Sequence, residues 1–163
     1  MNIDDGNVYE LFNGKLYLMS SPSKDHQAIS TEILRQLGNF LIGKECEVTH
    51  DFNVKLNEEE DTVCIPDILV ICDKSKYGNN VYEGAPDFII EIASPSNAYR
   101  DYLEKLNAYR RAGVKEYWII DPEHKKVFVN LLVGNEYRLS EYAFEEVPIT
   151  VLTECNIDLS RFQ

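Results

Sequence analysis

Glu91 is the residue whose position most clearly predicts chemistry. It interrupts the otherwise apolar run Asp87-Phe88-Ile89-Ile90-Glu91-Ile92-Ala93, and such a run is typical of a central strand buried on both faces of a sheet. Burying an ionised carboxylate costs several kcal/mol unless the group is paired or bound to a metal. We therefore expect Glu91 either to face a cation in a cleft or to be satisfied by a neighbouring arginine or by backbone amides.

A second carboxylate is available from Asp67 or Asp87, each of which follows a proline. Asp87 and Glu91 lie on one strand about 13 Å apart, which is too far to share an ion. Asp67 begins the apolar run 68–71, and neighbouring strands are only about 5 Å apart. Asp67 and Glu91 are therefore placed to hold one Mg²⁺ or Mn²⁺, hard ions that prefer oxygen ligands. An aspartate after Pro66 is equally typical of a turn at the start of a strand.

The elements that position these carboxylates are predicted from local patterns. Asn13-Gly14 predicts a type I′ hairpin of residues 9–12 and 16–19, because both central residues of that turn need positive φ. Apolar residues at helical spacing predict helices over 23–42 and 97–112, the first capped by Ser23 or Asp25 and both ended by a glycine. In the second helix we expect the sheet to be contacted by Leu103, Leu106 and Tyr109 or Ala108.

The remaining predicted elements are strands over 45–56, 65–72, 87–93 and 116–120, an acidic loop over 57–61, a turn over 121–124, and a hairpin of 127–133 and 137–142. This order predicts the α/β class, in the form of an α+β fold with a mixed β-sheet and helices packed on it. The sequence contains no repeat or linker, so we expect a single domain over residues 1–163.

Net charge limits the possible partners. The chain has 28 acidic and 16 basic residues, a formal charge of -12, which argues against a protein that coats nucleic acid nonspecifically through Lys and Arg. Residues 100–111 contain four basic and two acidic residues, a net of +2. That segment is either a small nucleic-acid face or a solvated helix of mixed charge.

The four cysteines, Cys46, Cys64, Cys72 and Cys155, form no Cys-x-x-Cys pair. We expect buried thiols in a reducing compartment rather than disulfides or a zinc site. The N-terminus has no basic and apolar signal segment, and no apolar stretch approaches the ~20 residues that span a bilayer. A cytoplasmic protein without membrane contact is therefore predicted.

An ordered set of residues carries a resemblance to a known family. The set consists of Pro66-Asp67, Glu91 with Ser94-Pro95-Ser96, Asp101, Lys105, Tyr109, Gly113-Val114 and Glu116-Tyr117-Trp118-Ile119-Ile120-Asp121-Pro122. It resembles the Uma-type family of restriction-endonuclease-like proteins, which is assigned to the PD-(D/E)xK nuclease superfamily. The resemblance implies a restriction-endonuclease-like core and Mg²⁺-dependent hydrolysis of phosphodiester bonds. It does not by itself imply a known substrate; DNA is the substrate that we expect.

The chain departs from the superfamily pattern at Ala93, where a lysine usually stands two residues after the glutamate on the same face of the strand. The resemblance implies that Lys105, on the following helix, supplies this amine and assists the attacking water. The competing interpretation is a surface salt bridge between Asp101 and Lys105, which are four residues apart, worth only about 0.3–0.5 kcal/mol.

Three further residues are weaker candidates for the site. The backbone carbonyl around Ile92 is a possible metal ligand. Glu32 resembles the position from which some superfamily members add a third acid, although a solvated glutamate on a helix face is the ordinary interpretation. His26, at the start of the same helix, is either a capping residue or part of the metal shell. Tyr109, Tyr117 and Trp118 have spacings that suit core packing.

These observations favour a metal-dependent nuclease in which Asp67 and Glu91 bind the ion and Lys105 assists the water. The alternative is a catalytically silent binding or dimerisation module of the same fold, which Ala93 and the acidic charge favour. A metal-dependent hydrolase of a small phosphodiester is a third possibility that suits the acidity. For a short domain that meets duplex DNA, we also expect a homodimer.

Overall fold

A computed structural model describes residues 6–56, 62–94 and 98–163, without the side chains of residues 98–101. Its centre is a six-stranded mixed sheet in the order β11-β10-β9-β8-β6-β3. These strands are β3 (Glu47–Thr49), β6 (Ile68–Ile71), β8 (Phe88–Ile92), β9 (Glu116–Asp121), β10 (Lys126–Val133) and β11 (Glu136–Ala143). Only β8 and β9 run parallel among these neighbours. The predicted mixed sheet is confirmed.

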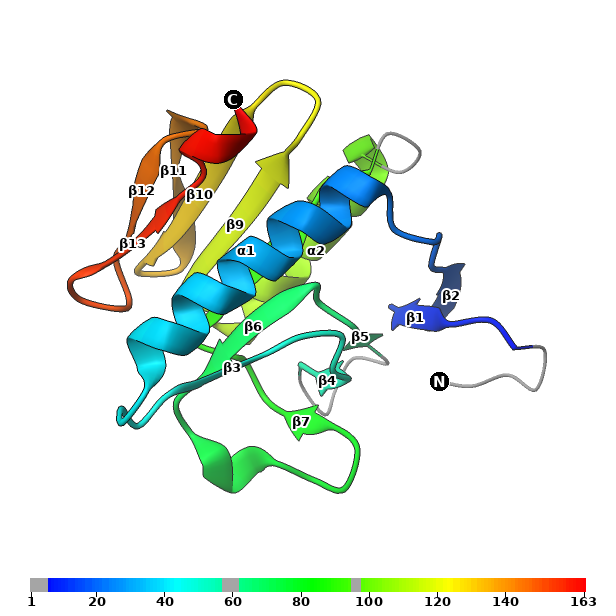
Figure 1. The fold of residues 1–163 in the computed structure, drawn as a ribbon. Helices are drawn as coiled ribbons and strands as arrows, with labels where there is room; N and C mark the ends of the chain where they lie inside the picture. Colours follow the sequence, from blue (N-terminus) through cyan, green and yellow to red (C-terminus); the bar gives the residue numbers. More distant parts are fainter. Residues whose placement is uncertain (1–5, 57–61, 95–97) are drawn as a thin grey trace.

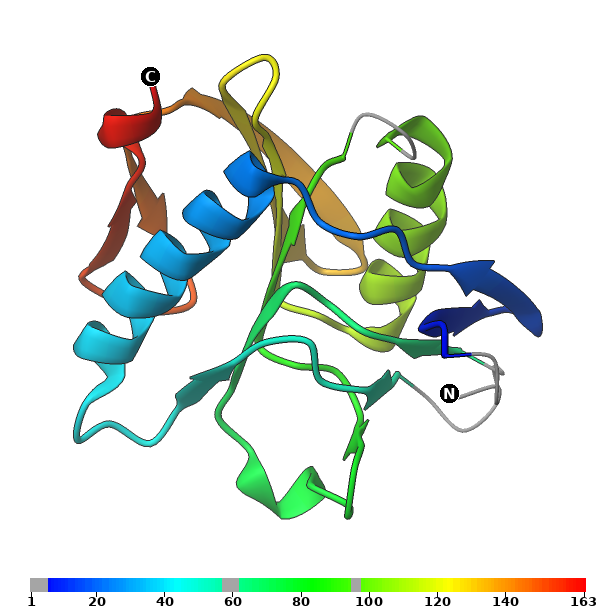
Figure 2. The same cartoon turned by 45° about the vertical axis from the view of Figure 1, so that its right-hand side comes forward.

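The two helices cover opposite faces of this sheet (Figures 1 and 2). Helix α1 (Lys24–Leu41) shares one face with the hairpin of β12 (Glu146–Ile149) and β13 (Cys155–Asp158). Helix α2 (Ala98–Ala112) lies on the other face, beside a smaller sheet in the order β2-β1-β5-β4-β7. That sheet contains β1 (Tyr9–Phe12), β2 (Lys15–Leu18), β4 (Val54–Lys55), β5 (Val63–Cys64) and β7 (Tyr82–Glu83). Two short 3-10 helices, η1 (Lys74–Lys76) and η2 (Ser160–Phe162), complete the described elements.

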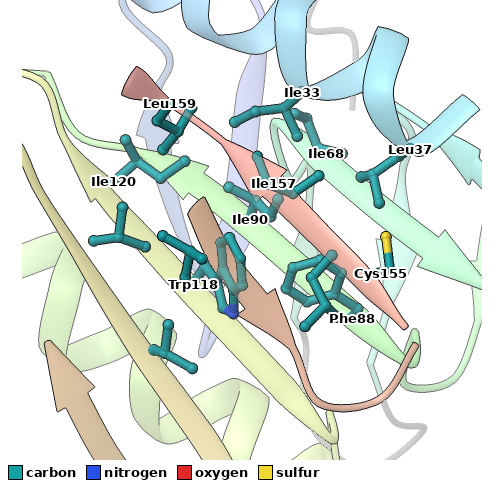
Figure 3. Packing of buried hydrophobic residues seen from close by; sticks show 14 of the residues in the cluster. Ile33, Leu37, Ile68, Phe88, Ile90, Trp118, Ile120, Cys155, Ile157 and Leu159 are labelled. Carbon is teal, nitrogen blue, oxygen red and sulfur yellow. The ribbon is translucent and has the colours of Figure 1, made fainter. Parts of the chain in front are cut away.

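Alternation along the central strands builds a hydrophobic core on each face. Ile33 and Leu37 of α1 pack over Ile68, Ile90 and Trp118 (Figure 3), whereas the intervening strand residues belong to the core beneath α2. Fully burying one such aliphatic side chain contributes roughly 1.5–3 kcal/mol. The central strands are therefore apolar on both faces, and a charged residue within them needs a specific partner.

The predicted turns and caps are present. Asn13 and Gly14 adopt φ of 47° and 74° between β1 and β2, the left-handed pair that a type I′ turn requires. Ser23 caps α1, with its hydroxyl accepting a hydrogen bond from the His26 amide at 3.1 Å. Gly43 and Gly113, with φ of 75° and 89°, follow the two helices in the conformation that glycine adopts most readily.

The predicted strand over 45–56 is wrong, because the chain changes sheets within it. β3 belongs to the central sheet and β4 to the smaller one. Between them Asp51 adopts φ of 48°, and its amide donates to the carbonyl of Pro66 at 3.2 Å. The β12–β13 hairpin was missed altogether, and the acidic loop over 57–61 lies outside the described residues.

One predicted core contact of α2 is also wrong. Leu103 is 51% exposed, whereas Ala108 and Tyr109 are buried and Leu106 is half-buried. The more enclosed stripe contains Lys105 and Tyr109, two of the least exposed side chains of the helix. The apolar spacing did not predict this stripe, because one of its members is a lysine. Its low exposure indicates that Lys105 faces an internal partner.

The expectation of four reduced thiols is wrong for one pair. Cys46 and Cys72 form a disulfide. They lie directly beyond the paired residues Glu47 and Ile71 of the antiparallel strands β3 and β6, so the register places them opposite each other. Cys64 and Cys155 are buried free thiols, as expected. None of the described helices has the length and apolar character needed to cross a membrane.

Candidate functional site

Asp67 and Glu91 meet at one end of the central sheet. Strands β6 and β8 are antiparallel with Ile68 opposite Ile90, so continuing the register by one residue places Asp67 opposite Glu91. Both alternate with residues of the core beneath α2, namely Leu69 and Ile89. The two carboxylates therefore lie on the same face of adjacent strands. Asp67 Oδ2 also accepts a hydrogen bond from the Ile92 amide at 2.7 Å.

Glu91 is satisfied by two donors from α2. Its Oε1 accepts from Lys105 Nζ at 2.9 Å and from the Tyr109 hydroxyl at 2.8 Å, and the side chains of Lys105 and Glu91 are each only 13% exposed. Burial raises the pKa of Glu91, the charge of Lys105 opposes this, and Asp67 and Glu10 raise the pKa further. The partner of Glu91 is therefore a lysine and a tyrosine, in place of the arginine or backbone amides that were the alternatives to a cation site.

Glu10 holds Lys105 from the opposite side. Its Oε1 lies 3.1 Å from Lys105 Nζ and accepts from the Ile65 amide at 2.9 Å. Burial opposes the charge of Lys105, but Glu10 and Glu91 outweigh it and keep the pKa of Lys105 well above its ordinary value. Lys105 is therefore a charged ammonium fixed between two carboxylates, beneath the Phe12 ring at 6.0 Å.

His26 reaches the same place from the first turn of α1. Its Nε2 lies 3.1 Å from Asp67 Oδ2, and its Nδ1 is buried without a hydrogen-bond partner among the described residues. Burial lowers the pKa of His26, but the hydrogen bond to Asp67 and the charges of Asp67, Glu91 and Asp51 raise it overall. The capping of α1 is done by Ser23, so the side chain of His26 is used to fix Asp67.

The remaining predicted site residues lie elsewhere or outside the described side chains. Glu32 is buried, not solvated, and contacts Arg35 and Arg161 away from the two carboxylates. The side chain of Asp101 is outside the description, whereas the described contacts of Lys105 are with Glu10 and Glu91, not with the surface.

Two residues of this site, Glu10 and Tyr109, were missed as functional candidates. Alternation within β1 places Glu10 on the same buried face as Phe12, so a glutamate at an inward position was an available signal. Tyr109 was assigned to the core, where it does lie, but its hydroxyl reaches Glu91. Nothing in the local sequence of α2 distinguishes that hydroxyl from an ordinary core tyrosine.

A cleft of about 1080 Å³ is lined by the charged side chains described above, namely Glu10, Asp67, Glu91 and Lys105. Its walls come from the β1–β2 hairpin, the start of α1, the first half of α2 and the ends of the central strands. Asp87, the other aspartate considered, is not part of it. Asp87 instead accepts from the Cys72 amide and lies 2.6 Å from Lys115 Nζ.

The donor chemistry of this cleft fits a hard divalent cation. The hydrogen bonds described above use Oδ2 of Asp67 and Oε1 of Glu91, one oxygen of each carboxylate. In the described part of the chain, no group of three or more His, Cys, Asp or Glu side chains is arranged to hold a metal. Mg²⁺ does not require three such side chains, because it keeps several waters and is usually bound through one or two carboxylates.

Comparisons with known proteins agree with this fold. The model of the Uma2 family, described as "Putative restriction endonuclease", matches residues 2–160. A solved structure described as "a putative nuclease belonging to DUF820" from Anabaena variabilis ATCC 29413 superposes with a TM-score of 0.81 over 99% of this chain and 92% of that one, at 20% identity.

One curated relative is "Uncharacterized protein slr1290" from Synechocystis sp. (strain ATCC 27184 / PCC 6803 / Kazusa). It is 29% identical over 102 residues, which are 62% of this chain and 53% of that protein. The chain therefore spans about half the length of this relative.

Proposed function

This chain belongs to the Uma2 family of restriction-endonuclease-like proteins, and we propose that residues 1–163 form one domain that hydrolyses phosphodiester bonds in DNA with the help of a divalent metal ion. The observation that carries the proposal is the contact of Lys105 with Glu91 at 2.9 Å. Ala93 occupies the strand position where the superfamily usually has a lysine. In this chain Lys105 of α2 places an ammonium beside the Glu91 carboxylate instead.

Asp67 and Glu91 would hold Mg²⁺ or Mn²⁺, and the carbonyl of Ile92 is an additional candidate ligand on the same strand end. When bound, such an ion supplies Lewis-acid stabilisation of negative charge on a phosphodiester. Three neighbouring contacts support this assignment. His26 and the Ile92 amide fix Oδ2 of Asp67, and the Tyr109 hydroxyl fixes Oε1 of Glu91. The carboxylates are thus oriented by the protein itself.

Lys105 would stabilise the negative charge that develops on the scissile phosphate and the attacking oxygen. A preorganised ammonium on a side chain that is only 13% exposed is suited to this, because it need not reorganise during the reaction. Glu10 would act as a positioning residue, since its carboxylate holds the ammonium of Lys105 at 3.1 Å. Asp101 and Glu32 have no part in this proposal.

Calorimetric titration with Mn²⁺, followed by a nuclease assay on single- and double-stranded DNA, tests the proposal. We expect the wild type to bind Mn²⁺ and cleave DNA, and Glu91→Ala to lose both properties. Glu123→Gln is a matched control, because Glu123 is exposed in the turn after β9. Cleavage that survives Glu91→Ala would argue against this site.

A catalytically silent binding or dimerisation module is the second candidate. It is favoured by one observation: Lys105 and Tyr109 already satisfy the buried carboxylate of Glu91 without a metal. A folded wild type that neither binds Mn²⁺ nor cleaves DNA would support it. We also propose a homodimer, which sedimentation equilibrium measures directly.

A further inference from the structure

We propose that the cleft accepts an unstacked, single-stranded segment of nucleic acid rather than a duplex. This inference rests on the proposed nuclease function and names the form of its substrate. Three independent features of the cleft support it: its charge, its size and the aromatic side chains in its walls.

The charge of the cleft is opposite to that of a duplex-binding groove. Among the described residues that line it, five carry carboxylates and Lys105 alone carries an ammonium or guanidinium; the five are Glu10, Asp51, Asp67, Glu91 and Glu104. Duplex binding depends on several Lys or Arg side chains that displace counterions along the phosphate backbone, whereas a single strand can also gain affinity from its exposed bases, which stack on aromatic side chains. Lys105 is a single ammonium, held by Glu10 and Glu91, so it can contact the scissile phosphate but cannot neutralise a series of backbone phosphates.

The basic residues at the end of α2 do not supply the missing footprint. Arg110 and Arg111 lie outside the residues that line the cleft. The guanidinium of Arg110 donates to the carbonyl of Asn135 and to the carboxylate of Glu136, at the β10–β11 hairpin. The two arginines at the end of α2 are therefore not part of the cleft lining, and the side chain of Arg100 is outside the described residues.

The size of the cleft suits a short occupant. Its volume of about 1080 Å³ is slightly above the roughly 300–1,000 Å³ range of pockets that enclose small ligands. A cleft of this size can enclose a nucleotide or a few nucleotides. A stacked duplex presents its backbone over a much longer surface and needs a correspondingly extended groove.

Aromatic side chains in the walls provide the stacking surfaces that unpaired bases require. Tyr17 on β2 and Tyr102 on α2 line the cleft and are half-buried. Each is held edge-on by another ring, Tyr17 by Phe12 at 6.3 Å and Tyr102 by Phe128 at 6.3 Å. Stacking of a base on such a ring contributes to affinity and tolerates any sequence, because every base has a π-face.

Cleavage of a single-stranded oligonucleotide without self-complementarity is compared, in Mn²⁺, with cleavage of the same oligonucleotide annealed to its full complement as a blunt duplex. We expect the single strand to be cut at least tenfold faster. Equal or faster cleavage of the duplex would overturn the inference while leaving the nuclease function intact. If neither is cut, the proposed function fails, and fluorescence anisotropy with the same two oligonucleotides then decides the inference, because single-strand binding supports it and absence of that binding overturns it.

Variants of the stacking rings sharpen the binding measurement. Tyr17→Leu and Tyr102→Leu should each weaken single-strand binding about tenfold, whereas Tyr17→Phe and Tyr102→Phe should retain it because the ring remains. Tyr142→Leu is the control, since Tyr142 lies on β11 outside the cleft. We expect a shallow dependence of affinity on salt, because few phosphates are neutralised by basic side chains. Equal affinity in all the leucine variants would contradict the stacking role.

Discussion

The ammonium of Lys105 lies 2.9 Å from Oε1 of Glu91, although one residue is on helix α2 and the other on strand β8. The same ammonium contacts Glu10 of the N-terminal hairpin at 3.1 Å. A lysine is suited to this arrangement, because its long flexible stem carries a compact charge into a site while the helix backbone stays outside. The contacts of Lys105 thus join three elements that are distant in the sequence.

Lys105→Ala should leave Mn²⁺ binding nearly intact and lower the cleavage rate roughly 10²-fold or more, the size seen when one preorganised stabiliser is removed. Lys105→Arg should restore little of the rate, because the guanidinium is a wide planar fork. Single-turnover kinetics at saturating Mn²⁺ measure both effects. Lys126→Ala, a surface variant on β10, is the control, and wild-type cleavage by Lys105→Ala would remove Lys105 from the mechanism.

Glu10→Gln should lower the cleavage rate by about tenfold, because it replaces a charge-assisted hydrogen bond worth roughly 1.5–3 kcal/mol with a weaker neutral one. The glutamine can still accept from the Ile65 amide, so the hairpin should remain in place. The rate is measured together with Mn²⁺ affinity. With Lys105 held by Glu91 alone, we also expect weaker Mn²⁺ binding; an unchanged rate and affinity would show that Glu10 has only a structural role.

Asp67→Ala should abolish the heat of Mn²⁺ binding as completely as Glu91→Ala, because the two carboxylates lie on one face of adjacent strands. Asp73→Ala is the matched control, since Asp73 lies outside the cleft at the start of η1. Isothermal titration calorimetry gives both results. Retained Mn²⁺ affinity in Asp67→Ala would place the ion elsewhere.

Glu32→Gln should lower the free energy of unfolding at neutral pH by roughly 1–3 kcal/mol, because it removes a buried charge that is bonded to Arg35 and Gln36. The Arg35 hydrogen bond is the main reason that the pKa of Glu32 falls from 4.5 to about 2. A lowered folded-state pKa contributes stability that is complete above pH 4.5 and is lost as the pH falls toward 2.

The difference between wild type and Glu32→Gln should therefore shrink over that acidic interval. Urea unfolding at a series of pH values measures it. Glu145→Gln, an exposed change beside β12, should show no such convergence. A constant difference between wild type and Glu32→Gln across the interval would mean that the carboxylate is not the stabilising group.

Replacing both Cys46 and Cys72 by serine should lower the free energy of unfolding by roughly 3 kcal/mol, because the disulfide closes a loop across a sequence separation of 26 residues. A reductant should destabilise the wild type by a similar amount and should not affect the double variant. Thermal unfolding with and without reductant makes the comparison. A reductant effect that persists in the double variant would point to another thiol.

Local sequence patterns determined much of the fold. The alternation of strand residues and the helical spacing of apolar residues predicted both helices and both major hairpins, since these depend on near neighbours in the chain. The pairing of Asp67 with Glu91 was also within reach, because it needs only that two apolar strands lie side by side. The division of the 45–56 segment was not, because it depends on Asp51 donating to Pro66 in another strand.

Tertiary packing alone decided the rest of the site. Glu10 and Lys105 are 95 residues apart and meet because the β1–β2 hairpin and α2 cover the same face of the central sheet. Cys46 and Cys72 pair because β3 and β6 adopt one particular register. Neither contact can be predicted from the residues adjacent in the sequence. An inward glutamate or a half-buried cysteine acquires its partner only when separate elements pack together.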